Sequence, residues 1–265
     1  MKEKERVVFF LRDGLSAAEK ERMAAYGADM NKYLDSGNEA RIKKAYESRD
    51  PRLQMAVITP YAQYNGASSG IAHTYTLRWP YRGSDSAEPF DIRTDTNDKF
   101  YYLWRKFVPE GLEQTERDTY GLDIPLIRYA EVLLLKAEAL NEWGSTHESE
   151  AIRCVNEVRR RAGHVELNNA TYPATKVNGQ SDLRERIRNE YYWEIGGEDS
   201  MYFHELRWGT WKDKKFDNNR NGLMQMWGET TYTWYWLGDQ CWSWPIPAKE
   251  MEMNSNLEQN EGWIN

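Results

Sequence analysis

The sequence predicts a mainly α-helical protein in which helical hairpins are joined by long loops and a few short strands. Three observations support this fold class. Apolar residues recur at helical spacing in three long segments, residues 124–144, 147–162 and 181–195. Gly, Pro and Ser divide residues 52–110 into short extended pieces. With 265 residues, the chain is long enough to bury a sizeable core.

The first third opens with a predicted pair of helices. Ser16 and Glu19 have the spacing of a capping box, which is typical of a helix start. An apolar face follows at helical steps, at Met23, Tyr26, Met30 and Tyr33. Gly37 ends this helix, and a second helix is expected over about 38–48. It must end before Pro51, because the residue before a proline disfavours the α conformation.

The middle of the chain contains the clearest helical signal. Residues 124–144 are apolar around most of the helix, which predicts a largely buried helix ending at Gly144. Its polar stripe is narrow, consisting of Arg128, Glu131, Glu138 and Glu142. Ser145 and Glu148 predict a second capping box, and the next helix extends to Gly163. The two helices form a hairpin about the size of one tetratricopeptide unit.

Two further segments complete the expected fold. A helix starts near Ser181 and is broken at Gly196. Its apolar residues repeat every fourth position, at Leu183, Ile187, Tyr191 and Ile195. A short helix or turn follows within residues 199–209. Residues 230–247 are expected to be extended, with a turn signal at 238–239 that is compatible with a hairpin.

Composition excludes several classes of partner. The net charge is −7 and the isoelectric point is about 5.3, and the chain has no long basic run. We therefore expect neither nucleic acid nor an anionic membrane as a main partner. No stretch approaches the roughly 18 apolar residues of a membrane span. Cys154 and Cys241 are expected to be buried thiols, with a disulfide as the weaker alternative.

The aromatic content gives the first indication of a binding face. Aromatic residues make up 14% of the chain, with 12 Trp and 17 Tyr, which is more than one core needs. Trp and Tyr can stack on the apolar face of a sugar ring while planar polar side chains bind its hydroxyl edge. Two loop segments combine these residue types. The predicted ligand-binding residues are Trp79, Tyr81, Arg78, Asp85, Tyr64 and Tyr61. Packing in the core is the alternative for each aromatic residue.

No motif predicts an enzyme or a cofactor. Ser68 matches G-x-S-x-G, but neither a buried strand before it nor a helix after it is indicated, so a loop is expected. The four histidines, His73, His147, His164 and His204, lack the H-x-x-x-H spacing of a zinc site. No GxGxxG or P-loop sequence is present. We therefore predict no catalytic residue, no metal ligand and no cofactor.

Charged residues near residue 190 allow two interpretations. Glu190, Glu194 and Glu198 are spaced four apart on one predicted helix, close to Arg184, Arg186 and Arg188. A pair of carboxylates can hydrolyse glycosides. An ion-pair network at the helix end is the favoured interpretation. Residues 159–161 are three arginines in the last turn of the helix expected over residues 147–162. Their positive charge there interacts favourably with the helix dipole.

Six segments in the same order resemble the C-terminal region of the SusD/RagB family of surface nutrient-binding lipoproteins of Bacteroidetes-type bacteria. They are "RDPRL" (49–53), "IRYAEVLLLKAEALNEWG" (127–144), "AIRCVNEVRRRAG" (151–163), "LRERIRNEYYWEIGGED" (183–199), "ELRWG" (205–209) and "WPIPAKEMEMNSNLEQNEGW" (244–263). In that family the last segment resembles a clasp. The resemblance implies that a polar run packs back on the helical body and that the final tryptophan anchors it.

The resemblance also implies a function. It implies non-catalytic binding of an oligosaccharide or polysaccharide and delivery to a SusC-like TonB-dependent transporter at the extracellular face of the outer membrane. The family's signal peptide and lipid-bearing cysteine have no counterpart here, so membrane association is expected only through an N-terminal anchor outside this chain. A peptide-binding RagB-like protein, a glycoside-active enzyme and a structural scaffold that contacts only the transporter are the alternatives.

The resemblance sets the expected domain organisation as well. Residues 1–265 are expected to form a single SusD/RagB-like domain. Within it, 1–120 would contain the helical pair and a loop-rich, ligand-facing segment. Residues 121–265 would contain the helical core and the C-terminal clasp.

Overall fold

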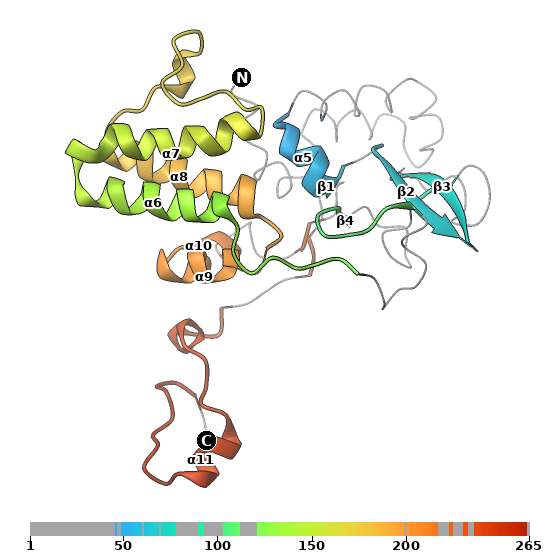
Figure 1. The fold of residues 1–265 in the computed structure, drawn as a ribbon. Coiled ribbons are helices and arrows are strands. Elements are labelled where there is room, and N and C mark those ends of the chain that lie inside the picture. The colour runs from blue at the N-terminus through green and yellow to red at the C-terminus, as the bar shows by residue number, and fades with distance from the viewer. Residues whose placement is uncertain are drawn as a thin grey trace. The chain divides into compact units, whose positions relative to one another are not determined.

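The computed structural model shows a mainly α-helical chain with a few short strands, as predicted (Figure 1). It describes residues 46, 49–59, 61–68, 70–77, 90–92, 103–111, 121–198, 200–216, 223–224, 230–232 and 236–263. Contacts group the chain into two compact units. The first is Met1–Met201 with Gln225–Glu229, and the second is Tyr202–Met224 with Thr230–Asn265. The predicted division at residue 120 stays a prediction.

Three helices form the core of the first unit. They are α6 (Tyr129–Trp143), α7 (Glu148–Arg161) and α8 (Gln180–Ile195), and α6 packs against both of the others (Figure 1). The apolar face predicted for α8 is confirmed, because its four residues are at most 1% exposed. Leu134 and Ala137 of α6 and Val155 of α7 are also fully buried. No helix among the residues described here is long and apolar enough to cross a membrane.

Helix α6 is shorter and less buried than predicted. It begins at Tyr129, and the four residues 124–127, which include Pro125, are not helical. Only one face of the helix is covered. The exposed apolar residues are Tyr129, Val132, Leu135 and Trp143, preceded by Ile124, Leu126 and Ile127. The prediction of a largely buried helix was therefore wrong, because α7 and α8 cover one side of α6 only.

The predicted second capping box is also wrong. Gly144 ends α6 as expected, with φ 141°. The next residues, Ser145–His147, form a 3₁₀ turn rather than a cap, and α7 begins at Glu148. The backbone N–H of Glu148 donates to the Ser145 carbonyl. Glu148 is therefore the first residue of α7 rather than the third, which is the position of the glutamate in a capping box.

A short helix, α5 (Pro51–Ala56), was not predicted. Asp50 caps it by accepting a hydrogen bond from the backbone N–H of Arg52, and Pro51 occupies the first turn. This is a standard start signal for a helix, and the sequence contained it. Of the helices predicted within residues 16–48, the structure describes only the helical Tyr46.

Short antiparallel strands follow α5, as expected for this region. Strand β1 (Val57–Ile58) pairs with β4 (Leu103–Trp104), and β2 (Gln63–Ser68) pairs with β3 (Ile71–Thr76). A small apolar cluster lies beside them. It contains Ile58, Tyr64 and Leu77, with Ala62, Ile92, Leu103 and Val108 packed against it.

The end of α8 is closely packed against β4. Gly197 has φ +82°, and a Cβ there would lie 2.8 Å from the ring of Trp104. Only glycine meets both conditions without strain. This contact fixes the chain after α8 beside residues 103–111.

The second unit is built from short elements. These are most of α9 (Ser200–Arg207), α10 (Trp211–Phe216), the strand pair β5 (Leu223–Met224) and β6 (Thr230–Tyr232), and α11 (Ala248–Met253). The short helix predicted within residues 199–209 is confirmed as α9. The hairpin predicted at 238–239 is wrong, because Gly238 precedes a 3₁₀ helix, Asp239–Trp242.

The C-terminal tail folds back on its own segment. The side-chain amide of Gln259 accepts from the backbone N–H of Ile246 at 2.7 Å and donates to the Ile246 carbonyl at 2.9 Å. The indole N–H of Trp263 donates to the Ser243 carbonyl at 2.9 Å. The anchoring role expected of the final tryptophan is confirmed within this unit. Packing of the tail on the helical body stays a prediction.

Candidate functional site

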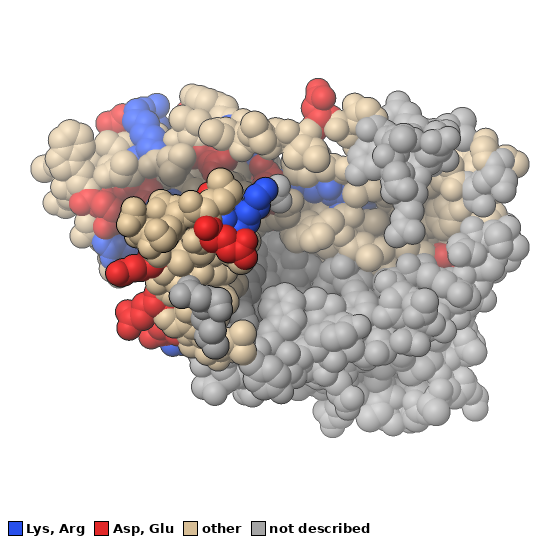
Figure 2. Space-filling model, turned by 90° about the horizontal axis from the view of Figure 1, so that it is seen from below, with Lys and Arg blue, Asp and Glu red and all other residues tan. Residues whose placement is uncertain are grey.

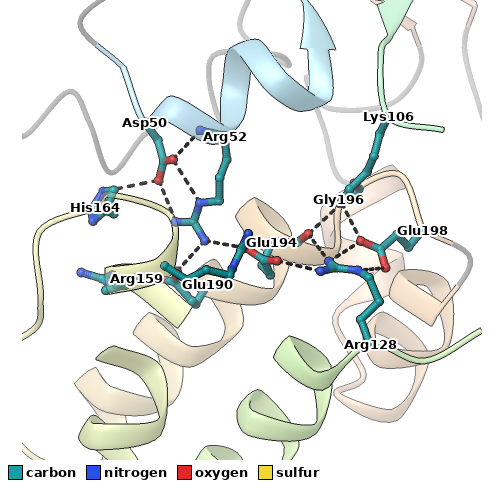
Figure 3. Close-up of polar contacts among 11 residues, drawn as sticks. Asp50, Arg52, Lys106, Arg128, Arg159, His164, Glu190, Glu194, Gly196 and Glu198 are labelled. Atoms are coloured by element: carbon teal, nitrogen blue, oxygen red, sulfur yellow. Dashed lines mark hydrogen bonds and ion pairs between the residues drawn. The ribbon is translucent and has the colours of Figure 1, made fainter. Parts of the chain in front are cut away.

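A network of buried charges joins α5 to the three-helix core (Figure 3). The Arg52 guanidinium lies at its centre. It donates to both carboxylate oxygens of Asp50, at 3.0 and 2.7 Å. It also donates to Glu190 at 2.7 Å and to Glu194 at 3.2 Å. The side chain of Arg52 is 9% exposed and that of Glu190 is fully buried, so water does little to weaken these contacts.

A second arginine completes the inner part of the network. Arg159 Nε donates to Glu190 at 2.8 Å, and its Nη1 donates to the Val165 carbonyl at 3.1 Å. The Trp193 ring lies beside both guanidinium groups, 5.5 Å from Arg159 and 6.0 Å from Arg52. His164 stacks on the same ring, and its Nε2 lies 3.5 Å from Asp50.

The outer part of the network fixes the chain around residues 106 and 128. Arg128 donates to Glu194 at 3.0 Å and to Glu198 at 2.6 and 2.9 Å. Lys106 Nζ donates to Glu198 at 2.5 Å and to the carbonyls of Glu194 and Gly196. Glu190, Glu194 and Glu198 therefore each contact at least two cations.

The network shifts the pKa values of its members. Burial alone would raise the pKa of Asp50, but the hydrogen bonds and charge of Arg52 hold it below the ordinary value. Burial likewise opposes the ionised form of Glu198, yet Arg128 and Lys106 keep its pKa low. For Lys106, burial lowers the pKa despite the hydrogen bond to Glu198.

The prediction of an ion-pair network at Glu190, Glu194 and Glu198 is confirmed, but its predicted partners were wrong. The neighbouring arginines of α8 pair elsewhere: Arg184 with Glu142, Arg186 with Asp182 and Arg188 with Glu185. Arg159 and Arg161 reach α8 instead, so their role is not limited to the helix dipole. Carboxylates that are ion-paired with arginines in this way are unsuited to glycoside hydrolysis. That reaction needs two carboxyl groups that face the substrate, one as acid and one as base or nucleophile.

A cleft of about 710 Å³ lies next to the network, and we call it the α5 cleft. One part of its lining comes from α5 and from Arg49, two residues before α5, and the other part comes from the chain after β4. The lining residues are Arg49, Pro51, Gln54, Met55, Arg105, Lys106, Phe107 and Glu110. Lys106 belongs to both the cleft and the network, so the network holds one wall of the cleft in place.

The polar edge of the α5 cleft is fixed by a hydrogen-bonded chain. Arg105 Nε donates to Glu110 at 2.5 Å, and the other oxygen of Glu110 accepts from the backbone N–H of Asn65 at 3.3 Å. This contact ties β2 to the cleft. The hydrogen bond from Arg105 lowers the pKa of Glu110.

The apolar side of the α5 cleft combines two residues. Met55 is 74% exposed, and Phe107 is partly buried. Phe107 has φ +61°, a left-handed backbone conformation that is uncommon for a bulky residue. Such strained positions cluster at ligand sites, where the surrounding structure holds them.

Two of the predicted ligand-binding residues lie in the core. Tyr61 is 2% exposed and Tyr64 is 8% exposed, and the Tyr64 hydroxyl donates to the Pro109 carbonyl at 2.7 Å. Neither ring has a face open for stacking on a sugar, so we leave both out of the proposed site. The other predicted residues, Arg78, Trp79, Tyr81 and Asp85, lie outside the described residues.

Sequence reasoning missed the residues of the α5 cleft. The start signal at Asp50 and Pro51 would have predicted α5, and with it the outward positions of Gln54 and Met55. Arg105 and Phe107 carried no comparable signal, because their positions depend on pairing between β1 and β4, whose paired residues are 45 and 47 positions apart.

The other residues considered for catalysis or metal binding do not form a reactive site within the described part of the chain. Ser68 ends β2 of the hairpin with β3, so G-x-S-x-G does not form the strand–turn–helix of a nucleophile elbow. His164 is 9% exposed and stacks on Trp193. The parts of the chain that the structure describes contain no group of three or more His, Cys, Asp or Glu placed to bind a metal. Cys154 and Cys241 are free thiols.

The described surface carries mixed charge. Figure 2 shows acidic and basic side chains interspersed on the described atoms of one face, without a continuous field of either sign. On this face, no single sign of charge dominates the described surface.

Family comparison is consistent with the motif pattern described above. The SusD family profile matches residues 13–263, which is nearly the whole chain. The chain belongs to the SusD family. The predicted resemblance to SusD/RagB proteins is thereby confirmed.

Curated relatives within this family include a SusD-like protein and a starch-binding protein. The chain is 32% identical over 139 residues to SusD-like protein P38 of Formosa agariphila, and 28% identical over 161 residues to the starch-binding protein SusD of Bacteroides thetaiotaomicron. These matches span 52% and 60% of this chain, but only 24% and 25% of the relatives. The matched part is thus about a quarter of each relative's length.

A solved structure supports the fold. A SusD-like protein from Bacteroides fragilis superposes with a TM-score of 0.57 at 22% identity, covering 83% of this chain and 40% of that protein. At this identity the likeness bears on the fold alone, and it agrees with the helical architecture described above.

Proposed function

We propose that this SusD-family chain is a non-catalytic glycan-binding component of a nutrient-uptake system. It captures an oligosaccharide at the extracellular face of the outer membrane and delivers it to a SusC-like TonB-dependent transporter. Family membership and the starch-binding relative support glycan binding in general. The surface location and the transporter are proposals that rest on the family resemblance.

The lining of the α5 cleft is the structural observation that supports this proposal. Met55 and Phe107 offer apolar surface, and Gln54, Arg105 and Glu110 offer planar polar groups beside it. Sugar rings need this combination, with an apolar face for their C–H groups and hydrogen-bonding groups for their hydroxyls. The neighbouring acidic residues that hydrolysis could use are paired with arginines instead.

The residues predicted from the aromatic loops remain part of the proposal. Arg78, Trp79, Tyr81 and Asp85 follow β3 in the sequence, and β3 is paired with the β2 strand that contacts Glu110. We propose that these residues extend the glycan site beyond the α5 cleft, with Trp79 as a stacking surface.

The test is calorimetry and tryptophan fluorescence against a panel of plant, host and microbial polysaccharides and a peptide digest. The variants are Phe107→Ala, Trp79→Ala and, as a distant control on the exposed face of α7, Arg153→Ala. We expect a panel glycan to bind, Phe107→Ala and Trp79→Ala to weaken that binding, Arg153→Ala to leave it unchanged, and the glycan to be recovered intact.

Three results would contradict the proposal. Cleavage of the glycan by the purified protein would support the glycosidase alternative. Binding of peptides with no glycan bound would support the RagB-like alternative. Binding of nothing in the panel would favour a structural scaffold.

A further inference from the structure

We infer that the α5 cleft prefers an acidic saccharide, one whose carboxylate or sulfate group is bound by the Arg105 guanidinium. The inference rests on the proposed function and deepens it, because it names the class of glycan. Three features of the cleft support it. The terminal nitrogens of Arg105 are available to a ligand, apolar side chains lie in the same cleft, and most of its charged lining residues are cationic.

The lining of the cleft is positively charged, although the protein is acidic. Three cationic residues, Arg49, Arg105 and Lys106, line it against the one acidic lining residue Glu110. The whole chain, in contrast, has a net charge of −7. Among the described lining residues the balance therefore favours an anion, and a partly enclosed cleft strengthens such local fields.

Arg105 provides the hydrogen-bond donors for that anion. Its Nε is used by Glu110, whereas its two terminal nitrogens have no hydrogen-bond partner within the described part of the chain. Its side chain is 25% exposed, so it is accessible from solvent. A guanidinium presents a planar pair of N–H groups that matches a carboxylate or sulfate in a bidentate arrangement.

The other two cations act through charge rather than through free donors. Lys106 Nζ already donates to Glu198 and to two backbone carbonyls, which satisfies its three N–H groups. Arg49 is 7% exposed and has contacts of its own. Of the three cationic lining residues, Arg105 is thus the one placed to contact a ligand directly.

The position of Arg105 is fixed before a ligand arrives. Its backbone N–H donates to the Ala56 carbonyl at 2.9 Å, at the end of α5. The bond from Nε to Glu110 orients the guanidinium plane. A fixed guanidinium loses little conformational freedom on binding, which favours affinity.

The apolar surface explains why the anion should belong to a sugar rather than to a free ion. Met55 from α5 and Phe107 from the chain after β4 both line the cleft, and a small inorganic anion would use neither. A pyranose ring with an acidic substituent uses both the apolar surface and the guanidinium.

The experiment compares two forms of one polymer. Polygalacturonate and its methyl ester share the same sugar backbone and differ in the charge of the carboxyl group. Calorimetry with both polymers is performed on the wild type, on Arg105→Gln and on the control Arg153→Gln. Arg153 is exposed on α7, and its side chain is paired with Glu150.

We expect the wild type to bind the acidic polymer roughly 10- to 100-fold more tightly than the ester, as one charge-assisted bidentate contact allows. Arg105→Gln should lose this preference and bind both forms like the wild type binds the ester. Arg153→Gln should bind both forms as the wild type does. A sulfated galactan and its desulfated form repeat the comparison and distinguish sulfate from carboxylate.

A second variant keeps the test valid if Arg105→Gln fails to fold. Glu110→Gln removes the carboxylate that competes for Arg105, so the ratio of the affinity for the acidic polymer to the affinity for the ester should rise several-fold above the wild-type ratio. A ratio of the two affinities below the wild-type ratio would count against the inference.

The two proposals fail in different ways. Equal binding of acidic and neutral forms, unaffected by Arg105→Gln, would overturn the preference for acidic sugars and leave glycan binding intact. Absence of binding to these polymers and to every glycan of the wider panel would overturn the proposed function itself.

Discussion

Arg52 shows how single residues hold this fold together. Its guanidinium contacts Asp50 two positions away and Glu190 and Glu194 on a helix that lies 138 and 142 residues further along the chain. Burying a charge is costly unless it is paired, and removing one partner leaves the others unpaired. The network is therefore sensitive to single substitutions.

Glu190→Gln should destabilise the protein strongly. Glu190 is fully buried and accepts hydrogen bonds from both Arg52 and Arg159. A neutral amide would remove the carboxylate that pairs with the buried Arg159 and one of the three carboxylates that contact Arg52. We expect the free energy of unfolding in urea to fall by about 3–5 kcal/mol.

Glu166→Gln is the matched control. Glu166 pairs with Arg160 at the protein surface, where both side chains are more than one third exposed. Because exposed pairs contribute little, its effect should stay below about 1 kcal/mol. If both variants lowered the free energy of unfolding by a similar amount, burial would not be the reason for the sensitivity of the network.

The lowered carboxylate pKa values predict a loss of stability in acid. Asp50 and Glu198 titrate below their ordinary values of 3.8 and 4.5 in the folded protein. Between the folded and unfolded pKa values the unfolded state binds more protons, so stability rises with pH there and is lost as pH falls. We expect the free energy of unfolding to decrease steadily once pH drops below these ordinary values.

Denaturant titrations at a series of pH values measure this dependence. In Asp50→Asn the acid limb should be less steep, because one of the titrating groups is gone. A free energy of unfolding that stays constant down to pH 3 would contradict the prediction.

At the scale of elements, α6 has one buried and one exposed apolar face. Leu134 is 0% exposed and the adjacent Leu135 is 41% exposed. Leu134→Ala should cost about 2–5 kcal/mol, because it removes a fully packed side chain from the contact with α7 and α8. Leu135→Ala should cost less than about 1 kcal/mol. Thermal and urea unfolding of the two variants measure both values.

The two variants control for helix propensity, because both replace leucine by alanine in the same helix. A large loss for Leu135→Ala would mean that its face of α6 is covered in solution. That result would indicate that the exposed apolar residues between 124 and 143 contact another surface.

The elements differ in how far the sequence could predict them. α8 was predicted closely because its apolar period, Leu183 to Ile195, is a local signal. The start of α6 was misplaced because apolar content alone does not define a helix start. The partners of Glu190 could not be predicted, because Arg52 lies 138 residues away and no periodicity reports such a pairing. The α5 cleft was missed for the same reason, since two distant segments form its walls.

For the whole molecule, the overall charge and the local charge of the α5 cleft have opposite signs. The chain carries a net charge of −7, whereas the lining of the cleft is positive. An acidic polysaccharide is therefore repelled at long range and attracted at short range. Salt screens these two effects to different degrees, because exposed and distant charges are screened more than close contacts in a cleft.

This opposition predicts an unusual salt dependence for the binding of polygalacturonate. At about 0.01 M salt the screening length is about 30 Å, so the net negative charge acts on the approaching polymer. At about 0.15 M it is about 8 Å, and mainly the local field of the cleft remains. The association rate measured by biolayer interferometry should therefore rise between these two concentrations. It should change little for the methyl ester, which carries no charge. An association rate that falls steadily from the lowest salt concentration, as for a basic protein, would show that the overall charge does not oppose the approach of the polymer.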